Sequence, residues 1–180
     1  MGLRILVGAV VVLAALAAVV ATRPSEYRVA RATTIAAPPA VVFAQINDFH
    51  KWEAWNPWGK MDPGMKQTYE GAPAGVGAVY SWAGNHEVGE GRMTIVESRP
   101  DEQVRVKLDF YKPFAGTSVA TFTLAPQGTN QTLVAWSMEG QNNFIAKAMH
   151  MVINMDKMIG GQFEKGLAAM KTAAEAASKS

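Results

Sequence analysis

The stretch Gln103-Val104-Arg105-Val106-Lys107-Leu108-Asp109-Phe110-Tyr111 decides the fold, because apolar and charged residues alternate along it. Successive side chains of a β-strand point to opposite faces of the sheet, so the apolar residues share one face and the charged residues the other. An antiparallel sheet commonly buries one face and leaves the other in water. The stretch therefore predicts a strand of an antiparallel sheet with a single dry face.

The sequence on either side repeats this alternation between clusters of Gly, Pro, Asn and Asp, which are typical of turns. We expect the other strands at 26–36, 66–70, 78–83, 92–98, 117–125 and 132–139. The side chains expected on the dry face are Tyr80, Trp82, Met93, Ile95, Ala120, Phe122, Leu124, Val134, Trp136 and Met138. Together the segments predict a meander of about seven antiparallel strands.

Helical segments complete the predicted fold. Pro39 to Ile46 predicts a short helix, because proline suits the first turn, and a second short helical or looped piece is expected at 48–58. Apolar residues recur at helical spacing from Asn143 to Ala177, which predicts a long helix that Gly160-Gly161 weakens near its middle. Because a sheet with one apolar face must be covered, we predict an α+β helix-grip fold, with the curved sheet wrapped around this C-terminal helix.

The N-terminal segment differs from the rest, since residues 5–21 carry no charge. As a helix this run would span roughly 26 Å, close to the roughly 30 Å of a hydrocarbon core. We expect residues 1–22 to be a transmembrane anchor, with a cleaved signal peptide as the alternative, followed by a linker at 23–26 and a folded domain at 27–177. The expected localisation is single-pass in a membrane with the domain outside, although Arg23, Arg28 and Arg31 favour the opposite orientation.

Composition narrows the function classes. The residues after the apolar segment match the usual size of one domain, about 150 residues. The net charge is +2 with both signs mixed along the chain, so nucleic acid is not an expected partner. The chain has no cysteine, which excludes disulfides, thiolate metal ligands and a cysteine nucleophile.

Five stretches together carry a family resemblance. They are Ile35-Ala36-Ala37-Pro38-Pro39-Ala40-Val41-Val42-Phe43, Phe49-His50-Lys51-Trp52-Glu53-Ala54-Trp55-Asn56-Pro57-Trp58, Gly89-Glu90-Gly91-Arg92-Met93-Thr94-Ile95, Trp136-Ser137-Met138-Glu139-Gly140 and Phe163-Glu164-Lys165-Gly166-Leu167. With them the chain resembles the START-like or birch-pollen-allergen-like (SRPBCC) superfamily, in particular its bacterial polyketide cyclase/dehydrase-like members. The resemblance implies an apolar cavity between the sheet and the C-terminal helix. It implies no single reaction, because similar proteins bind lipids, sterols, polyketides or hormones, and others assist partner proteins.

The tryptophans point to such a cavity, since three of the five lie within residues 52–58. Large aromatic side chains with one polar atom suit the mouth of a ligand pocket. The alternative for each Trp is packing that closes the end of the sheet, and for each Met of the last helix ordinary core packing. The candidate ligand-binding residues are Trp52, Trp55, Trp58, Tyr80, Trp82, Met93, Phe110, Phe122, Trp136, Met151 and Met155.

Candidates for catalysis are few. His50, His86 and His150 lie in separate segments without the spacing of metal ligands, so we expect no metal, and no cofactor motif is present. His86 and Glu87, in the loop after Trp82, are the candidate acid-base pair, with simple solvation of this loop as the alternative.

Three functional hypotheses follow from these observations. The first is a membrane-tethered module that binds an apolar or amphipathic small molecule, such as a lipid or a polyketide-like compound. The second is a cyclase or dehydratase that uses the same cavity. The third is a protein-interaction or envelope-stress module whose cavity is filled by its own side chains. The sequence names no protein partner.

Overall fold

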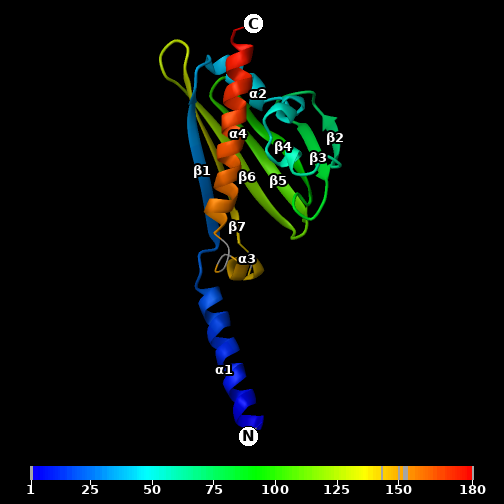
Figure 1. Cartoon of the computed structure of the whole chain (residues 1–180), viewed down its shortest axis with the longest axis vertical. Helices are drawn as coiled ribbons and strands as arrows, with labels where there is room; N and C mark the ends of the chain where they lie inside the picture. The colour runs from blue at the N-terminus through cyan, green and yellow to red at the C-terminus, as the bar shows by residue number, and fades with distance from the viewer. Residues whose placement is uncertain (1, 143, 150, 152–153, 180) are drawn as a thin grey trace.

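The computed structural model of the protein describes residues 2–142, 144–149, 151 and 154–179. Met1, Asn143 and His150 lie outside the described residues. The strands are β1 (Glu26–Ile35), β2 (Lys66–Gly71), β3 (Ala78–Ala83), β4 (Glu90–Arg99), β5 (Gln103–Lys112), β6 (Gly116–Pro126) and β7 (Thr132–Gln141). The α-helices are α1 (Gly2–Ala21), α2 (Pro39–Ile46), α3 (Phe144–Met149) and α4 (Met155–Ala177), and the 3-10 helices are η1 (Phe49–Ala54) and η2 (Trp58–Lys60) (Figure 1).

The strands form one 7-stranded antiparallel sheet in the order β1-β7-β6-β5-β4-β3-β2. The alternation in β5 predicted its faces correctly, because Val104 and Val106 are buried whereas Lys107 is exposed. The expected inner side chains of β6 and β7 are buried as well: Ala120, Phe122, Leu124, Val134, Trp136 and Met138. The predicted α+β class and the meander are thereby confirmed.

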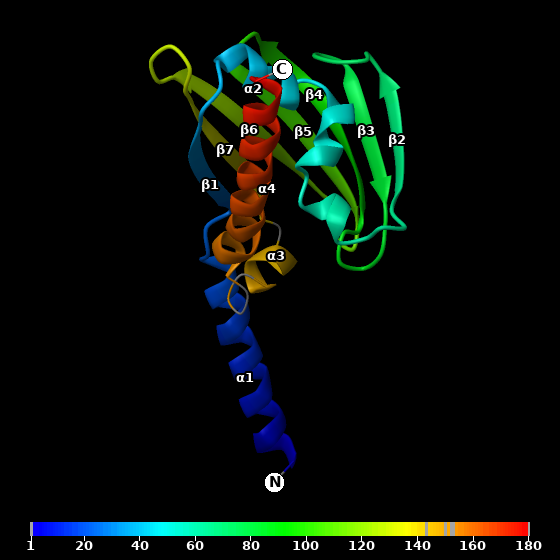
Figure 2. The same cartoon turned by 45° about the horizontal axis from the view of Figure 1, so that its top comes forward.

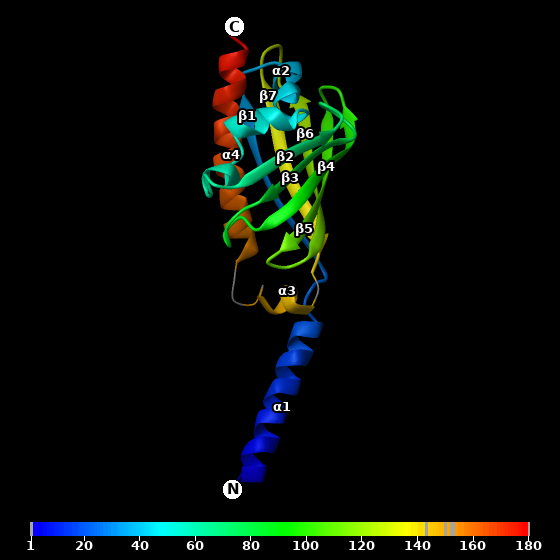
Figure 3. The same cartoon turned by 90° about the vertical axis from the view of Figure 1, so that its right-hand side faces the viewer.

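Helices α2, η1 and α4 cover one face of this sheet (Figures 1 and 3). Helix α4 packs on β1 and contacts α2 and η1, and its Phe163 ring stacks on Trp136 of β7 with centroids 4.1 Å apart. Aromatic rings of Trp55 and Trp58 meet Trp136 edge-on at 5.7 and 5.9 Å. The space between α4 and the sheet is therefore filled by aromatic side chains, where the family resemblance implied a cavity.

The C-terminal helical segment is divided into α3 and α4, which differs from the single helix predicted from 143 to 177. Helix α4 begins after Asn154, whose side chain accepts a hydrogen bond from the Lys157 amide at 2.9 Å. Such an N-cap satisfies an amide that has no partner within the helix and so favours a new helix start. Gly160 and Gly161, predicted to weaken the helix, lie inside α4.

An ion-pair cluster holds α4 against β1. Arg31 of β1 donates to Asp156 at 3.0 Å and to Glu164 at 2.7 Å, so it joins the first and third turns of α4. The arginine side chain crosses the helix at Gly160, where any larger residue would collide with the guanidinium group. Lys171 adds a hydrogen bond to the Thr34 carbonyl oxygen at 2.9 Å. The position of α4 on the sheet is thus set by polar contacts at its edge and by aromatic packing beneath it.

The predicted transmembrane anchor is wrong, because among the described residues no helix is both long and apolar enough to cross a bilayer. Helix α1 projects away from the sheet and touches the rest of the chain at α3 (Figure 1). This finding contradicts the single-pass membrane localisation expected from the sequence, and it does not support the membrane as a partner.

Candidate functional site

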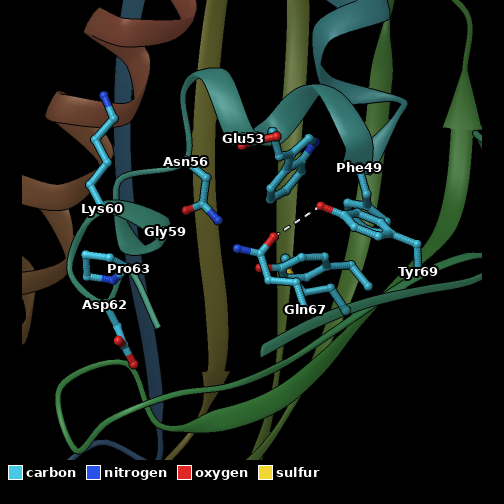
Figure 4. Close-up of a pocket in the computed structure, with 12 residues that line it drawn as sticks. Phe49, Glu53, Asn56, Gly59, Lys60, Asp62, Pro63, Gln67 and Tyr69 are labelled. Atoms are coloured by element: carbon cyan, nitrogen blue, oxygen red, sulfur yellow. Dashed lines mark hydrogen bonds between the residues drawn. The ribbon is translucent and has the colours of Figure 1, made fainter. Parts of the chain in front are cut away.

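A hollow of about 290 Å³ opens beside α4, on the half of the sheet formed by β2, β3 and β4. Its walls come from residues 49–93, with η1 and η2 on one side and the sheet on the other (Figure 4). The ribbon in Figure 2 shows these short helices between α4 and β3. The lining residues are Phe49, Trp52, Glu53, Asn56, Gly59, Lys60, Asp62, Pro63, Gln67, Tyr69, Tyr80 and Met93. We refer to this hollow as the first hollow.

One row of side chains across three strands forms the floor of the first hollow, and Gln67 of β2 lines it as well. Strand register places Tyr69 of β2 opposite Tyr80 of β3, and Tyr80 opposite Met93 of β4. The Tyr69 and Tyr80 rings have centroids 5.4 Å apart. Directly opposed residues share a face of the sheet, so the three side chains form a continuous, largely apolar floor.

The helical side is built by η1, which the sequence starts at Asp48. The Asp48 carboxylate accepts a hydrogen bond from the His50 amide at 2.9 Å and so caps the helix. Phe49 and Trp52 then point into the core, where their rings meet edge-on at 5.1 Å. The Trp52 indole N–H donates to the Ile46 carbonyl oxygen at 2.9 Å, which leaves its ring as a rigid apolar wall.

The rim of the first hollow is polar. The Asp62 carboxylate is occupied by backbone amides, because it accepts hydrogen bonds from Gly64 of its own loop at 3.0 Å and from Asn85 of the turn between β3 and β4 at 2.7 Å. Glu53 and Lys60 are exposed, and among the described residues neither takes part in an ion pair. Two charged groups of opposite sign are therefore available to a ligand at the mouth of the hollow.

Both tyrosines of the floor stay protonated at neutral pH. Burial, with a smaller contribution from Tyr69, raises the pKa of Tyr80 far above its ordinary value. Burial and the nearby Glu53 and Asp48 carboxylates raise the pKa of Tyr69. The Tyr69 hydroxyl donates to the Gln67 side-chain oxygen at 3.2 Å (Figure 4), whereas the Tyr80 hydroxyl has no hydrogen-bond partner among the described residues. The Tyr80 O–H remains available as a donor.

The residues predicted for ligand binding divide into three groups. Trp52, Tyr80 and Met93 line the first hollow. Trp55, Trp58, Phe122 and Trp136 belong to the aromatic packing between α4 and the sheet. Trp82 and Phe110 meet edge-on at 5.9 Å farther along the sheet, Met155 is half-buried at the start of α4, and Met151 is exposed between α3 and α4.

The candidate acid-base pair lies in the turn between β3 and β4. His86 and Glu87 are both exposed, and neither lines the first hollow. The turn is organised by Asn85, whose side chain accepts a hydrogen bond from the Glu87 amide at 2.9 Å. Among the described residues, no group of three or more His, Cys, Asp or Glu side chains is placed to hold a metal ion.

Sequence reasoning missed Gln67 and Tyr69, the two side chains that β2 contributes to the first hollow. The strand at 66–70 was expected, and residues two apart in a strand share a face. That spacing places the two side chains on the same face as each other, and the register of β2 with β3 puts them on the side of Tyr80 and Trp82. The polar rim residues Glu53 and Lys60 carry no such periodic signal, because they lie in short 3-10 helices.

Comparison with solved structures identifies the same fold in other proteins. A protein from Thermobifida fusca matches with a TM-score of 0.61 at 22% identity, over 82% of this chain and 92% of that one. A protein from Chromobacterium violaceum matches with a TM-score of 0.58 at 20% identity, over 84% and 99% of the two chains. The major latex-like protein 151 of Panax ginseng matches with a TM-score of 0.56 at 16% identity, over 86% and 99%. At these identities the likeness shows the fold alone.

The sequence itself connects the chain to a family. No curated protein matches it. The family model described as polyketide cyclase / dehydrase and lipid transport matches residues 26–175, a range that contains the whole sheet and all but the end of α4. The resemblance read from the sequence is thereby confirmed at the level of the family. The chain belongs to the polyketide cyclase / dehydrase and lipid transport family.

Proposed function

We propose that the first hollow binds a small amphipathic molecule that has a flat apolar body and at least one oxygen atom. The observation that carries the proposal is the combination, in one hollow, of an aromatic interior with a polar rim. Ligand sites in proteins are mostly apolar and contain a few polar groups that orient the ligand. This hollow has both parts.

The interior favours a ring system over a flexible chain. Phe49, Trp52 and Tyr80 present aromatic rings to the same space, and such rings pack well against other flat groups. The free Tyr80 hydroxyl can donate a hydrogen bond to a ligand oxygen, which would fix the orientation of the ring. Lys60 and Glu53 at the rim would then contact the polar end.

The size of the hollow limits the ligand and its affinity. Its volume of about 290 Å³ is at the small end of the roughly 300–1,000 Å³ that is usual for ligand pockets. For a probe of about 11 non-hydrogen atoms, such as para-butylphenol, about −0.5 kcal/mol per atom corresponds to a Kd on the order of 0.1 mM. Binding of this strength is measurable by isothermal titration calorimetry.

The test fills the hollow with a side chain. Gly59 lines it, and a Cβ added at Gly59 would have no neighbour within 4 Å, so Gly59→Phe introduces a ring without a collision at its base. A Cβ added at Gly116 of β6 would likewise have no neighbour within 4 Å, and Gly116 is exposed and lies outside the hollow. Gly116→Phe is therefore a matched control.

We expect the full chain and the Gly116→Phe variant to bind para-butylphenol with one saturable site. The Gly59→Phe variant should bind it at least tenfold more weakly. Equal binding by all three proteins would mean that the probe adsorbs elsewhere, for example on the exposed apolar side chains of α1, and would refute the proposal. Circular dichroism of the two variants checks that both remain folded.

A further inference from the structure

A second, smaller hollow of about 130 Å³ lies next to the first one, along β2 and β3. Its lining residues are Phe49, His50, Tyr69, Glu70, Gly71, Ala72, Pro73, Ala78 and Val79. Two side chains, Phe49 and Tyr69, line both hollows. These two rings are consequently the wall that divides one space from the other.

The two halves of this wall differ in how firmly they are held. Phe49 is 2% exposed and packs within the core against Trp52 and Tyr80. Tyr69 is 37% exposed and stands on β2, the outermost strand of the sheet, every residue of which is exposed. Removal of the Phe49 ring would leave a cavity in the hydrophobic core, whereas removal of the Tyr69 ring would affect only the boundary between the two hollows.

His50 holds the Tyr69 ring from the side of the second hollow. The two rings are stacked, with centroids 4.2 Å apart and planes within 17° of each other. The His50 ring is itself held by the Asp48 carboxylate, 3.0 Å from Nδ1. On the other side the Tyr69 hydroxyl donates to Gln67. His50 is thus a positioning residue that holds the Tyr69 ring in its place between the two hollows.

We propose that Tyr69 determines the length of ligand that this protein accepts, by closing the first hollow at the end where the second hollow begins. The inference rests on the proposed function of the first hollow. If the ring is removed, the two hollows join into one groove that runs along β2 and β3. A ligand with a longer apolar tail then finds room that the Tyr69 ring otherwise occupies.

A series of para-alkylphenols with ethyl, butyl, hexyl and octyl chains tests this. Each methylene that enters an apolar site raises affinity by about fourfold. For the full chain, we expect this gain to stop at the chain length that first reaches Tyr69. For Tyr69→Ser the gain in affinity should continue into the longer homologues. Octylphenol should therefore bind the Tyr69→Ser variant at least tenfold more tightly than it binds the unaltered protein.

Two control variants separate the ring from its hydroxyl and from general effects. Tyr69→Phe keeps the wall and should show the unaltered chain-length limit. Tyr111→Ser removes another exposed tyrosine, which lies on β5 and lines neither hollow, and it should also leave the limit unchanged. His50→Ala removes the ring that stacks on Tyr69. The chain-length limit of this variant should therefore lie between that of the unaltered protein and that of Tyr69→Ser.

The outcomes distinguish this inference from the proposed function. If butylphenol binding is lost in Gly59→Phe but the chain-length limit is the same in Tyr69→Ser and in the unaltered protein, Tyr69 is not the determinant and the proposed function stands. An unaltered protein whose affinity keeps rising through octylphenol would likewise overturn the inference. If no alkylphenol binds in the first hollow, the proposed function fails and the inference fails with it.

Discussion

Replacing Gly166 by alanine should leave the protein at most as stable as the parent, although the same change usually stabilises a helix. A Cβ at Gly166 would lie 2.8 Å from Cζ3 of Trp136 and 3.2 Å from Cδ of Pro57. Carbon atoms in contact prefer a separation of about 3.5–4.0 Å, so either α4 or the Trp136 ring must move. The ring has little freedom, because it stacks on Phe122 at 4.9 Å and on Phe163 at 4.1 Å.

The magnitude follows from two opposing contributions. Alanine in place of glycine within a helix stabilises it by about 1 kcal/mol, and overpacking a tight contact costs about 1–3 kcal/mol. Gly161 lies in the same helix, and a Cβ added there would have no neighbour within 4 Å, so Gly161→Ala retains only the favourable contribution. The two variants should therefore differ in the free energy of unfolding by about 1–3 kcal/mol, with Gly161→Ala above the parent and Gly166→Ala at or below it.

Equilibrium unfolding in urea, followed by tryptophan fluorescence and circular dichroism, measures both free energies on the full chain. Gly160→Ala provides a third comparison, because its obstacle is the flexible end of Arg31 and not a fixed ring. We expect its stability to lie between the other two. A Gly166→Ala variant as stable as Gly161→Ala would refute the close approach of α4 to Trp136.

Two further predictions concern Trp136 and the Arg31 cluster. The buried Trp136 indole N–H has no hydrogen-bond partner among the described residues, and an unpaired buried donor costs about 1–3 kcal/mol. The Trp55 indole N–H, by contrast, donates a hydrogen bond to the Gln45 carbonyl oxygen. Trp136→Phe should thus lower the free energy of unfolding less than Trp55→Phe does. The same urea assay checks this order, and the reverse order would contradict the prediction. Hydrogen bonding from Arg31 lowers the pKa of Asp156 below its ordinary 3.8, so its stabilising effect is present above that pH and is lost as the pH falls through the lowered pKa. The difference in Tm between the parent and Asp156→Asn should stay constant from about pH 7 to 5 and shrink below about pH 4, and a difference that does not change with pH would contradict this.

The strands and their faces were predictable because the information is local. In β5 the alternation of Val104, Arg105, Val106 and Lys107 indicates which face of the strand is buried, independently of the neighbouring strands. Predictions from local sequence patterns were wrong near both ends of the chain. The apolar run at the N-terminus predicted a membrane span that the structure does not support, and the helical pattern from 143 concealed the new start of a helix after Asn154.

The first hollow depends on information that no single segment contains. It is the space left between η1, η2 and three strands, and its volume depends on how those elements pack. Tyr69 belongs to a strand whose residues are all exposed, so its role as a wall appears only when β2 pairs with β3 and His50 stacks on the ring. The sequence could place Tyr80 and Met93 on inward faces and name Trp52 as a candidate pocket residue, but it could not say which of them border empty space.

By itself, the sequence determined the antiparallel meander, the dry faces of β5, β6 and β7 and the family, because periodic patterns and contiguous motifs depend on neighbouring residues alone. Only the tertiary structure decided that aromatic rings fill the space under α4 and that the hollow opens beside it, over β2 to β4. The physical reason is that a cavity is the volume that packing leaves unfilled, and packing brings together side chains that are far apart in the chain.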